Sequence, residues 1–198
     1  MIVAIINFCG FIISCLLMGY LYILSIQPAQ RVEKYGEKAW KDCKKFRSFG
    51  GFFELISVVN LLLWIWFPLP YVDLWIVNPN IWIGIAIAIL IAVPCCIIMF
   101  LGIKAAGSET LSPSKDTEMY GGIYRYIRHP QSLGEFPLFI AISFALNSWF
   151  LVLISFILIM IYVPIMIYYE ERDLIKRFGD KYRNYQKTTG ALVPKLRR

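Results

Sequence analysis

Long runs of apolar residues alternate with short polar segments along the chain. Five such runs cover residues 2–26, 51–67, 81–103, 132–146 and 149–168. An α-helix rises about 1.5 Å per residue, so a run of about 20 residues crosses the roughly 30 Å hydrocarbon core of a bilayer. Only Asn147 and Ser148 separate the last two runs, which predicts a tight helical hairpin. The pattern therefore predicts an all-α integral membrane protein with about five transmembrane helices.

The segment after the fifth run, residues 170–187, has a different pattern. Its apolar and aromatic residues recur at spacings of three and four, at Leu174, Ile175, Phe178, Tyr182 and Tyr185. This periodicity is typical of an amphipathic helix, and Gly179 is expected to interrupt it.

The composition agrees with a membrane protein. Of 198 residues, 59% are hydrophobic and only 17% are charged, which excludes a disordered chain and argues against an ordinary soluble enzyme. The chain has a net charge of +7, and its basic residues lie in the segments between the apolar runs. Anionic lipid headgroups are therefore a simpler partner than nucleic acid. Four of the five cysteines lie inside apolar runs, and there is a single histidine. Neither a zinc site nor a disulfide framework is expected.

The basic residues predict the orientation. The segments 27–50, 104–130 and the tail from 169 hold seven, four and nine Lys and Arg residues, and these are all 20 in the chain. Five spans place these three segments on one side of the membrane, in agreement with the positive-inside rule. We therefore expect the N-terminus outside or in the lumen and the C-terminus in the cytoplasm, of either a plasma membrane or the endoplasmic reticulum.

Two of the cytoplasmic segments carry side chains suited to binding a ligand. The run GGIYRYIRHP, residues 121–130, contains the single histidine, His129, and the predicted hairpin returns the pair Glu170-Glu171 to the same level. Carboxylates and aromatic rings together bind ligands that carry positive charge and hydroxyl groups. The alternative is that these residues are interface anchors, with the acidic pair at the start of a surface helix.

The spacing of these residues resembles a known family. The pattern G-x-Y-x-x-x-R-H-P from Gly122 to Pro130, then Gly134-Glu135, then Glu170-Glu171 followed by Leu174, Phe178-Gly179, Tyr182 and Tyr185, resembles the isoprenylcysteine carboxyl methyltransferase family. That family is similar to the membrane phospholipid methyltransferases. The resemblance covers about residues 104–194, and together with the apolar runs it predicts a single membrane domain over 1–198. Three N-terminal transmembrane helices, 1–103, would precede a methyltransferase-like core, 104–198, with the hairpin, the amphipathic helix and a cytoplasmic cofactor-binding cap.

The resemblance also implies S-adenosylmethionine as cofactor and no metal. Carried over by position, the cofactor-binding residues would be Asp116, Thr117, Glu118, Met119, Tyr124, His129, Pro130, Gln131, Ser132 and Glu170, with Glu109 as a weaker candidate. The implied partners are membrane lipid and a lipophilic small-molecule or prenylated substrate, and the sequence does not indicate an oligomeric state.

The methyl acceptor stays open, because the chain departs from the family pattern. Ser132 stands where the family usually has a tyrosine, and residues 164–169 contain no arginine, which carboxyl methyltransferases place there to hold a substrate carboxylate. The acceptor is an isoprenylcysteine-like carboxylate, a thiol, a phenol, an amine or a lipid headgroup. Glu135 lies inside a span, where a carboxylate is costly, and is the candidate catalytic base. A hydrogen bond to a neighbouring helix is its alternative role.

Two other functions stay open. Membrane reductases that use NADPH carry a similar R-H-P-x-Y-x-G-E segment, and Arg125 or Arg128 would then hold a phosphate. The third possibility is a non-enzymatic scaffold or transporter subunit. Glu54, near the start of the second run, is close enough to the interface to reach headgroups, and we expect no further role for it.

Overall fold

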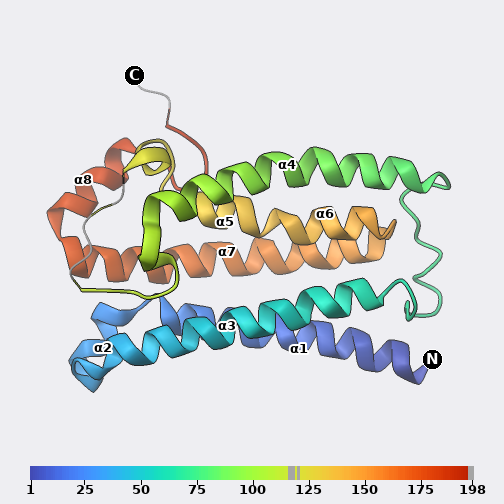
Figure 1. The fold of residues 1–198 in the computed structure, drawn as a ribbon, viewed down its shortest axis with the longest axis horizontal. Coiled ribbons are helices and arrows are strands. Elements are labelled where there is room, and N and C mark those ends of the chain that lie inside the picture. The colour runs from blue at the N-terminus through green and yellow to red at the C-terminus, as the bar shows by residue number, and fades with distance from the viewer. Residues whose placement is uncertain (116–118, 120, 196–198) are drawn as a thin grey trace.

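The computed structural model describes residues 1–115, 119 and 121–195, and its regular elements in that part of the chain are helices (Figure 1). Extended pairing there is limited to two isolated β-bridges, Ile76 with Ser148 and Ile127 with Gly190. The elements are α1 Ile2–Ser25, α2 Pro28–Tyr35, α3 Lys38–Leu63, α4 Ile81–Ala106, η1 Gly107–Thr110, η2 Gly122–Arg125, α5 Pro130–Glu135, α6 Pro137–Ala145, α7 Trp149–Phe178 and α8 Asp180–Thr188. The predicted all-α fold is confirmed.

Among the described residues, four helices are long and apolar enough to cross a membrane. They cover Ile2–Ser25, Lys38–Leu63, Ile81–Thr110 and Trp149–Phe178. The fourth predicted span, residues 132–146, consists of two shorter helices, α5 and α6, which meet at Phe136. Pro137 has no N–H to continue the hydrogen-bond ladder of α5, so a break is expected there. The chain is an integral membrane protein with four long helices and one divided helical segment.

The helices run alongside one another along the length of the molecule (Figure 1). Helix α1 packs along α3, and α4 packs along α5 and α6, which lie beside α7. The approach of α4 to α5 and α6 depends on glycine. A Cβ atom at Gly134 would lie 2.5 Å from the Cys95 carbonyl oxygen, and one at Gly84 would lie 2.4 Å from that of Phe144. Small residues allow this close backbone contact between membrane helices.

Short hydrogen bonds and one apolar cluster hold the helices together. The Ser57 hydroxyl donates to the Ser14 hydroxyl at 3.0 Å between α3 and α1, and the Ser143 and Ser155 hydroxyls are 3.1 Å apart between α6 and α7. Such bonds satisfy polar groups that have no water available in a bilayer. The cluster joins four helices and the residue after α3, and its buried members are Phe11, Leu61, Trp64, Phe139 and Leu151.

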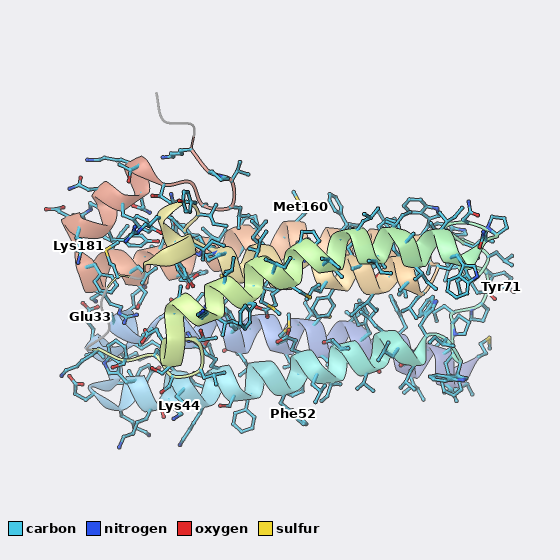
Figure 2. All side chains as sticks on the ribbon, turned by 45° about the horizontal axis from the view of Figure 1, so that its top comes forward. Glu33, Lys44, Phe52, Tyr71, Met160 and Lys181 are labelled. Carbon is cyan, nitrogen blue, oxygen red and sulfur yellow. The ribbon has the colours of Figure 1, made fainter. Side chains whose placement is uncertain are left out.

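The two ends of the helical assembly differ in polarity. Figure 2 shows Glu33, Lys44 and Lys181 at or toward one end, whereas the exposed side chains of Phe52 and Met160 project from its sides. Helices α2 and α8 and the short helices η1 and η2 all lie at this charged end (Figure 1). We call it the polar end, and the three basic segments of the sequence meet there.

Candidate functional site

His129 lies between the two neighbouring carboxylates of α7. Its Nδ1 atom is 2.9 Å from Glu170 Oε2 and its Nε2 atom is 3.0 Å from Glu171 Oε1. Because ionised carboxylates only accept hydrogen bonds, both ring nitrogens act as donors and the ring is an imidazolium. His129 precedes Pro130, the first residue of α5, and proline at N1 sets the chain direction into that helix. The predicted proximity of His129 and Glu170 is confirmed.

The pKa of His129 agrees with this geometry. The side chain is 3% exposed. Burial alone lowers the pKa of the ring, but the charges and hydrogen bonds of Glu170 and Glu171 outweigh burial and raise the pKa to about 9. The histidine therefore carries its charge at neutral pH and holds both carboxylates in place.

Glu171 is the more strongly held member of the pair. Its Oε1 accepts a 2.7 Å hydrogen bond from Arg128 Nε, and its Oε2 accepts one of 2.7 Å from Gln186 Nε2 in α8. Glu170 is more exposed, at 28% against 14% for Glu171, and it lines a pocket. Glu171 therefore holds Arg128 and Gln186 together within the protein, whereas Glu170 presents a carboxylate to the pocket.

The chain after α8 fixes the segment that carries His129. Arg128 N donates to Gly190 O at 2.9 Å, and His129 N donates to Ala191 O at 3.0 Å. The Arg128 guanidinium also donates to the carbonyl of Thr189. These bonds join the RHP segment to a part of the chain that the sequence pattern did not connect with it.

The pocket lies at the polar end and collects most of the expected cofactor-binding residues. Of that set, Met119, Tyr124, His129, Gln131, Ser132, Glu170 and the weaker candidate Glu109 line it. Pro130 is buried and is not among the lining residues, and Asp116, Thr117 and Glu118 lie outside the described residues. The lining also includes residues that were not expected, among them Tyr22, Arg47, Arg177, Phe178, Tyr182 and Tyr185.

Two tyrosines give the pocket its hydrogen-bonding character. Gln131 Nε2 donates to Tyr124 Oη at 3.0 Å and lies 3.1 Å from Thr110 Oγ1, so η1, η2 and α5 are joined. The Tyr182 hydroxyl is buried and has no hydrogen-bond partner among the described residues. Burial raises the pKa of Tyr182, which keeps this hydroxyl protonated and able to donate. A buried hydroxyl without a partner is costly unless a ligand completes its hydrogen bonding.

The arginines of the pocket are already engaged within the protein. Arg47 Nη1 donates to the Glu109 carbonyl at 2.6 Å, and Arg177 Nη2 lies 2.9 Å from Glu109 Oε1 and stacks on Trp40. Arg128 is bound by Glu171. These contacts tie α3, η1 and α7 together around the pocket.

Glu135 lies outside this pocket, next to Glu54 of α3. The two side chains are hydrogen-bonded to each other, and both are half-buried. Glu54 was expected to reach lipid headgroups, and it contacts another carboxyl group instead. Tyr22 lines the pocket.

Sequence reasoning missed several of these residues. Glu170 and Glu171 are not at the start of a surface helix, because α7 continues unbroken from Trp149 to Phe178 and ends before Gly179, where φ is +58°. Adjacent residues on a helix point about 100° apart, so the EE pair already indicates that the two carboxylates have different neighbours. Glu135 is the only charged residue in the predicted span 132–146. Glu54 is a second carboxyl in a predicted span, and this alone could have indicated it as a partner of Glu135.

Comparison with known proteins agrees with this site. Residues 79–181 match the phospholipid methyltransferase family. A methanethiol S-methyltransferase of Pseudomonas deceptionensis is 30% identical over 163 residues, which cover 71% of this chain and 56% of the relative. Methanethiol S-methyltransferase 1 of Bradyrhizobium diazoefficiens is 29% identical over 147 residues, which cover 68% of this chain and 50% of the relative.

The chain thus spans about half the length of the curated relatives it matches. No solved structure matches it. The family match covers more than half of the chain and includes His129, Glu135, Glu170 and Glu171. It also includes the whole hairpin of α5, α6 and α7. The chain belongs to the phospholipid methyltransferase family.

Proposed function

We propose that the chain is a membrane methyltransferase that uses S-adenosylmethionine and methylates a small thiol. The observation that carries the proposal is the pocket at the polar end, which is lined by Glu170, held by His129, and by Tyr182, whose hydroxyl has no hydrogen-bond partner among the described residues. S-adenosylmethionine carries a sulfonium, an ammonium and ribose hydroxyls, and it supplies an electrophilic methyl group when bound. A carboxylate acceptor and a phenol donor fit such a molecule.

The chain's own residues have separable roles in this proposal. Glu170 would accept hydrogen bonds from hydroxyl or ammonium groups, and the Tyr182 hydroxyl would donate one. The aromatic rings of Tyr22, Phe178 and Tyr185 would line the space around the positive centre, because ring faces attract cations. Methyl transfer requires positioning and exclusion of water, which a site at the edge of the membrane supplies.

A thiol acceptor fits better than a carboxylate. The turn of α7 before Glu170, residues 164–169, contains no cation to bind a carboxylate. The relatives named above are methanethiol S-methyltransferases by name, and a neutral thiol needs no charged partner to enter. The NADPH alternative is disfavoured by the engagement of Arg47, Arg128 and Arg177 within the protein, since a phosphate would have to displace carboxylate or carbonyl partners.

We place the polar end on the cytoplasmic side, because all Lys and Arg residues belong to the three segments that meet there. Helices α2 and α8 with η1 and η2 would form the cap over the cofactor on this side. S-adenosylmethionine, which is polar and soluble, would then enter from the cytoplasm.

The test is calorimetric binding of S-adenosylmethionine and S-adenosylhomocysteine to the detergent-purified protein, followed by detection of dimethyl sulfide from methanethiol. Glu170→Gln is expected to weaken binding roughly 10-fold or more, the value of a hydrogen bond to a charged group. Asp180→Asn, a matched carboxyl-to-amide change at an exposed position of α8, is expected to bind as the original chain does. Absence of binding by folded protein would overturn the proposal, and binding that both variants retain would overturn the site.

A further inference from the structure

A second cavity lies among the membrane helices, away from the polar end. It has a volume of about 360 Å³ and is bounded by α1, α6, α7 and Phe136, which lies between α5 and α6. Its walls are mainly apolar and include Phe11, Met18, Phe139 and Leu158. Tyr20 and Ile161 at its edge are exposed, at 62% and 59%. The cavity is therefore reachable from the lipid-facing side of α1 and α7 and suits a small apolar molecule.

One wall of this cavity contains an unsatisfied polar group. The Tyr162 hydroxyl is buried and has no hydrogen-bond partner within the described residues. The Tyr162 ring packs edge-on against Phe136, with centroids 5.1 Å apart, and against Gly19, where an added Cβ would lie 2.9 Å from the ring. Packing on both sides fixes the ring, so its hydroxyl stays unsatisfied unless a ligand reaches it.

The carboxyl pair Glu54–Glu135 is the neighbour of this tyrosine. Glu135 directly precedes Phe136, whose ring contacts the ring of Tyr162. An ionised carboxylate has no donor, so the hydrogen bond between Glu54 and Glu135 requires a proton on one of them. The pair then holds one proton and one negative charge, and Glu135 is one residue from Phe136, which bounds the apolar cavity.

We propose that Glu54 and Glu135 act as one proton-accepting unit for an alkyl thiol that occupies the apolar cavity and is oriented by the Tyr162 hydroxyl. This inference rests on the methyltransferase function proposed above and names the acceptor end of that site. An alkyl thiol is neutral and apolar enough to enter from lipid, and its S–H needs a base because its pKa, like that of a free cysteine, is about 8.5 or higher.

The proposed step balances in atoms and charge. The thiol gives its proton to the ionised oxygen of the pair, and its sulfur forms a bond to the methyl group. The bond between that methyl group and the sulfonium sulfur breaks, and its electron pair stays on that sulfur. The pair changes from one negative charge to none, the sulfonium from one positive charge to none, and the product is a neutral thioether. The pair afterwards releases the extra proton to water at the polar end.

The experiment compares Glu54→Gln and Glu135→Gln with the unsubstituted chain in detergent, using ethanethiol as acceptor. Each variant is expected to lower kcat roughly 100-fold, the usual contribution of a general base, while S-adenosylmethionine affinity stays unchanged. A fluorinated ethanethiol, which is far more acidic, is expected to restore much of the rate because it needs no base. Glu37→Gln, at an exposed position paired with Lys115, is the matched control and is expected to leave both substrates unaffected.

A second readout needs no methyl donor. Infrared difference spectra of the protein are expected to show a protonated-carboxyl band that shifts when ethanethiol is added, and the shift is expected to disappear in either Gln variant. Tyr162→Phe is expected to raise KM for ethanethiol with little change in kcat. Variants that keep the original kcat and the original dependence on thiol acidity would overturn the inference, as would a spectrum that ethanethiol does not change.

The two proposals fail in different ways. If the protein neither binds S-adenosylmethionine nor methylates a thiol, the proposed function is wrong, and a thiol-dependent infrared shift would still support the pair as a thiol site. If methylation proceeds and both Gln variants are unimpaired, the function stands and the proton-accepting pair is overturned.

Discussion

Glu171 Oε1 lies 2.7 Å from Arg128 Nε and 3.0 Å from His129 Nε2, so one carboxylate oxygen holds two consecutive residues of the RHP segment. Arg128 and Glu171 are 10% and 14% exposed. Within the described part of the chain, the neighbouring Glu170 bonds to His129, and it lines the pocket. The two adjacent glutamates thus have different roles: Glu171 holds the RHP segment, and Glu170 faces the pocket.

This division predicts different effects of the two Gln substitutions on stability. Glu171→Gln leaves Arg128 and His129 poorly compensated in a buried setting and is expected to lower the free energy of unfolding by about 3 kcal/mol. Glu170→Gln, at the more exposed position, is expected to cost less stability. Denaturant unfolding in detergent, followed by circular dichroism, measures both. Equal stability of the two variants would contradict the assignment.

The stability of the polar end is also expected to depend on pH through His129. The pKa of this ring, which burial alone would lower, is raised by Glu170 and Glu171 from about 6.5 to about 9. A pKa raised in the folded state contributes stability that is complete below about pH 6.5 and is lost as the pH rises through about 9. The melting temperature is therefore expected to fall between about pH 7 and pH 9.5. His129→Asn is expected to flatten this dependence, and an equally steep profile in that variant would assign the titration to another group.

The chain after α8 is expected to tolerate no side chain at Gly190. A Cβ there would lie 1.8 Å from the Val193 carbonyl oxygen, so Gly190→Ala must displace the backbone that pairs with Arg128 and His129. We expect loss of ligand binding at the polar-end pocket and faster proteolysis after α8. Gly51→Ala is the control, because an added Cβ in that part of α3 meets nothing within 4 Å. Intact binding in Gly190→Ala would show that the pairing is dispensable.

Substitution of two arginines at the polar end by alanine is expected to have very different effects on the stability of the protein. Arg177 and Glu109 are 10% and 7% exposed and 2.9 Å apart, so Arg177→Ala leaves a buried carboxylate and is expected to cost about 3 kcal/mol. Arg183 pairs with Asp180 on the exposed surface of α8, at 58% and 85% exposure, and Arg183→Ala is expected to have little effect on stability. Similar melting temperatures for the two variants would contradict the role of Arg177.

Much of the architecture follows from periodicity alone, because hydrophobic length and the spacing of Leu174, Phe178 and Tyr182 are local properties. The break at Gly179 follows in the same way, since glycine adopts the positive φ seen there. The division of the fourth predicted span at Phe136 was not predicted, although Pro137 gives the local reason for it. The expectation that His129 and Glu170 meet was correct because a tight hairpin constrains both ends of its arms.

The unpredicted contacts join residues that are far apart in the sequence. A second carboxyl in a span makes Glu54 a candidate partner of Glu135, but the sequence does not show that they meet, because the register between α3 and α5 depends on how α1 and α4 pack. Tyr22 and Arg47 reach the pocket for the same reason. Pairing of Gly190 with Arg128 uses backbone groups, which leave no trace in side-chain patterns.

Gly190 and Ala191 accept hydrogen bonds from Arg128 and His129, so a segment made after the hairpin closes one made before it. On the ribosome, helices α1 to α8 emerge before these two residues do. A nascent chain would therefore be inserted in the bilayer while its polar-end pocket is still open. Ligand binding then depends on the synthesis and pairing of this segment, and a product truncated before Gly190 would occupy the membrane without competing for the ligand.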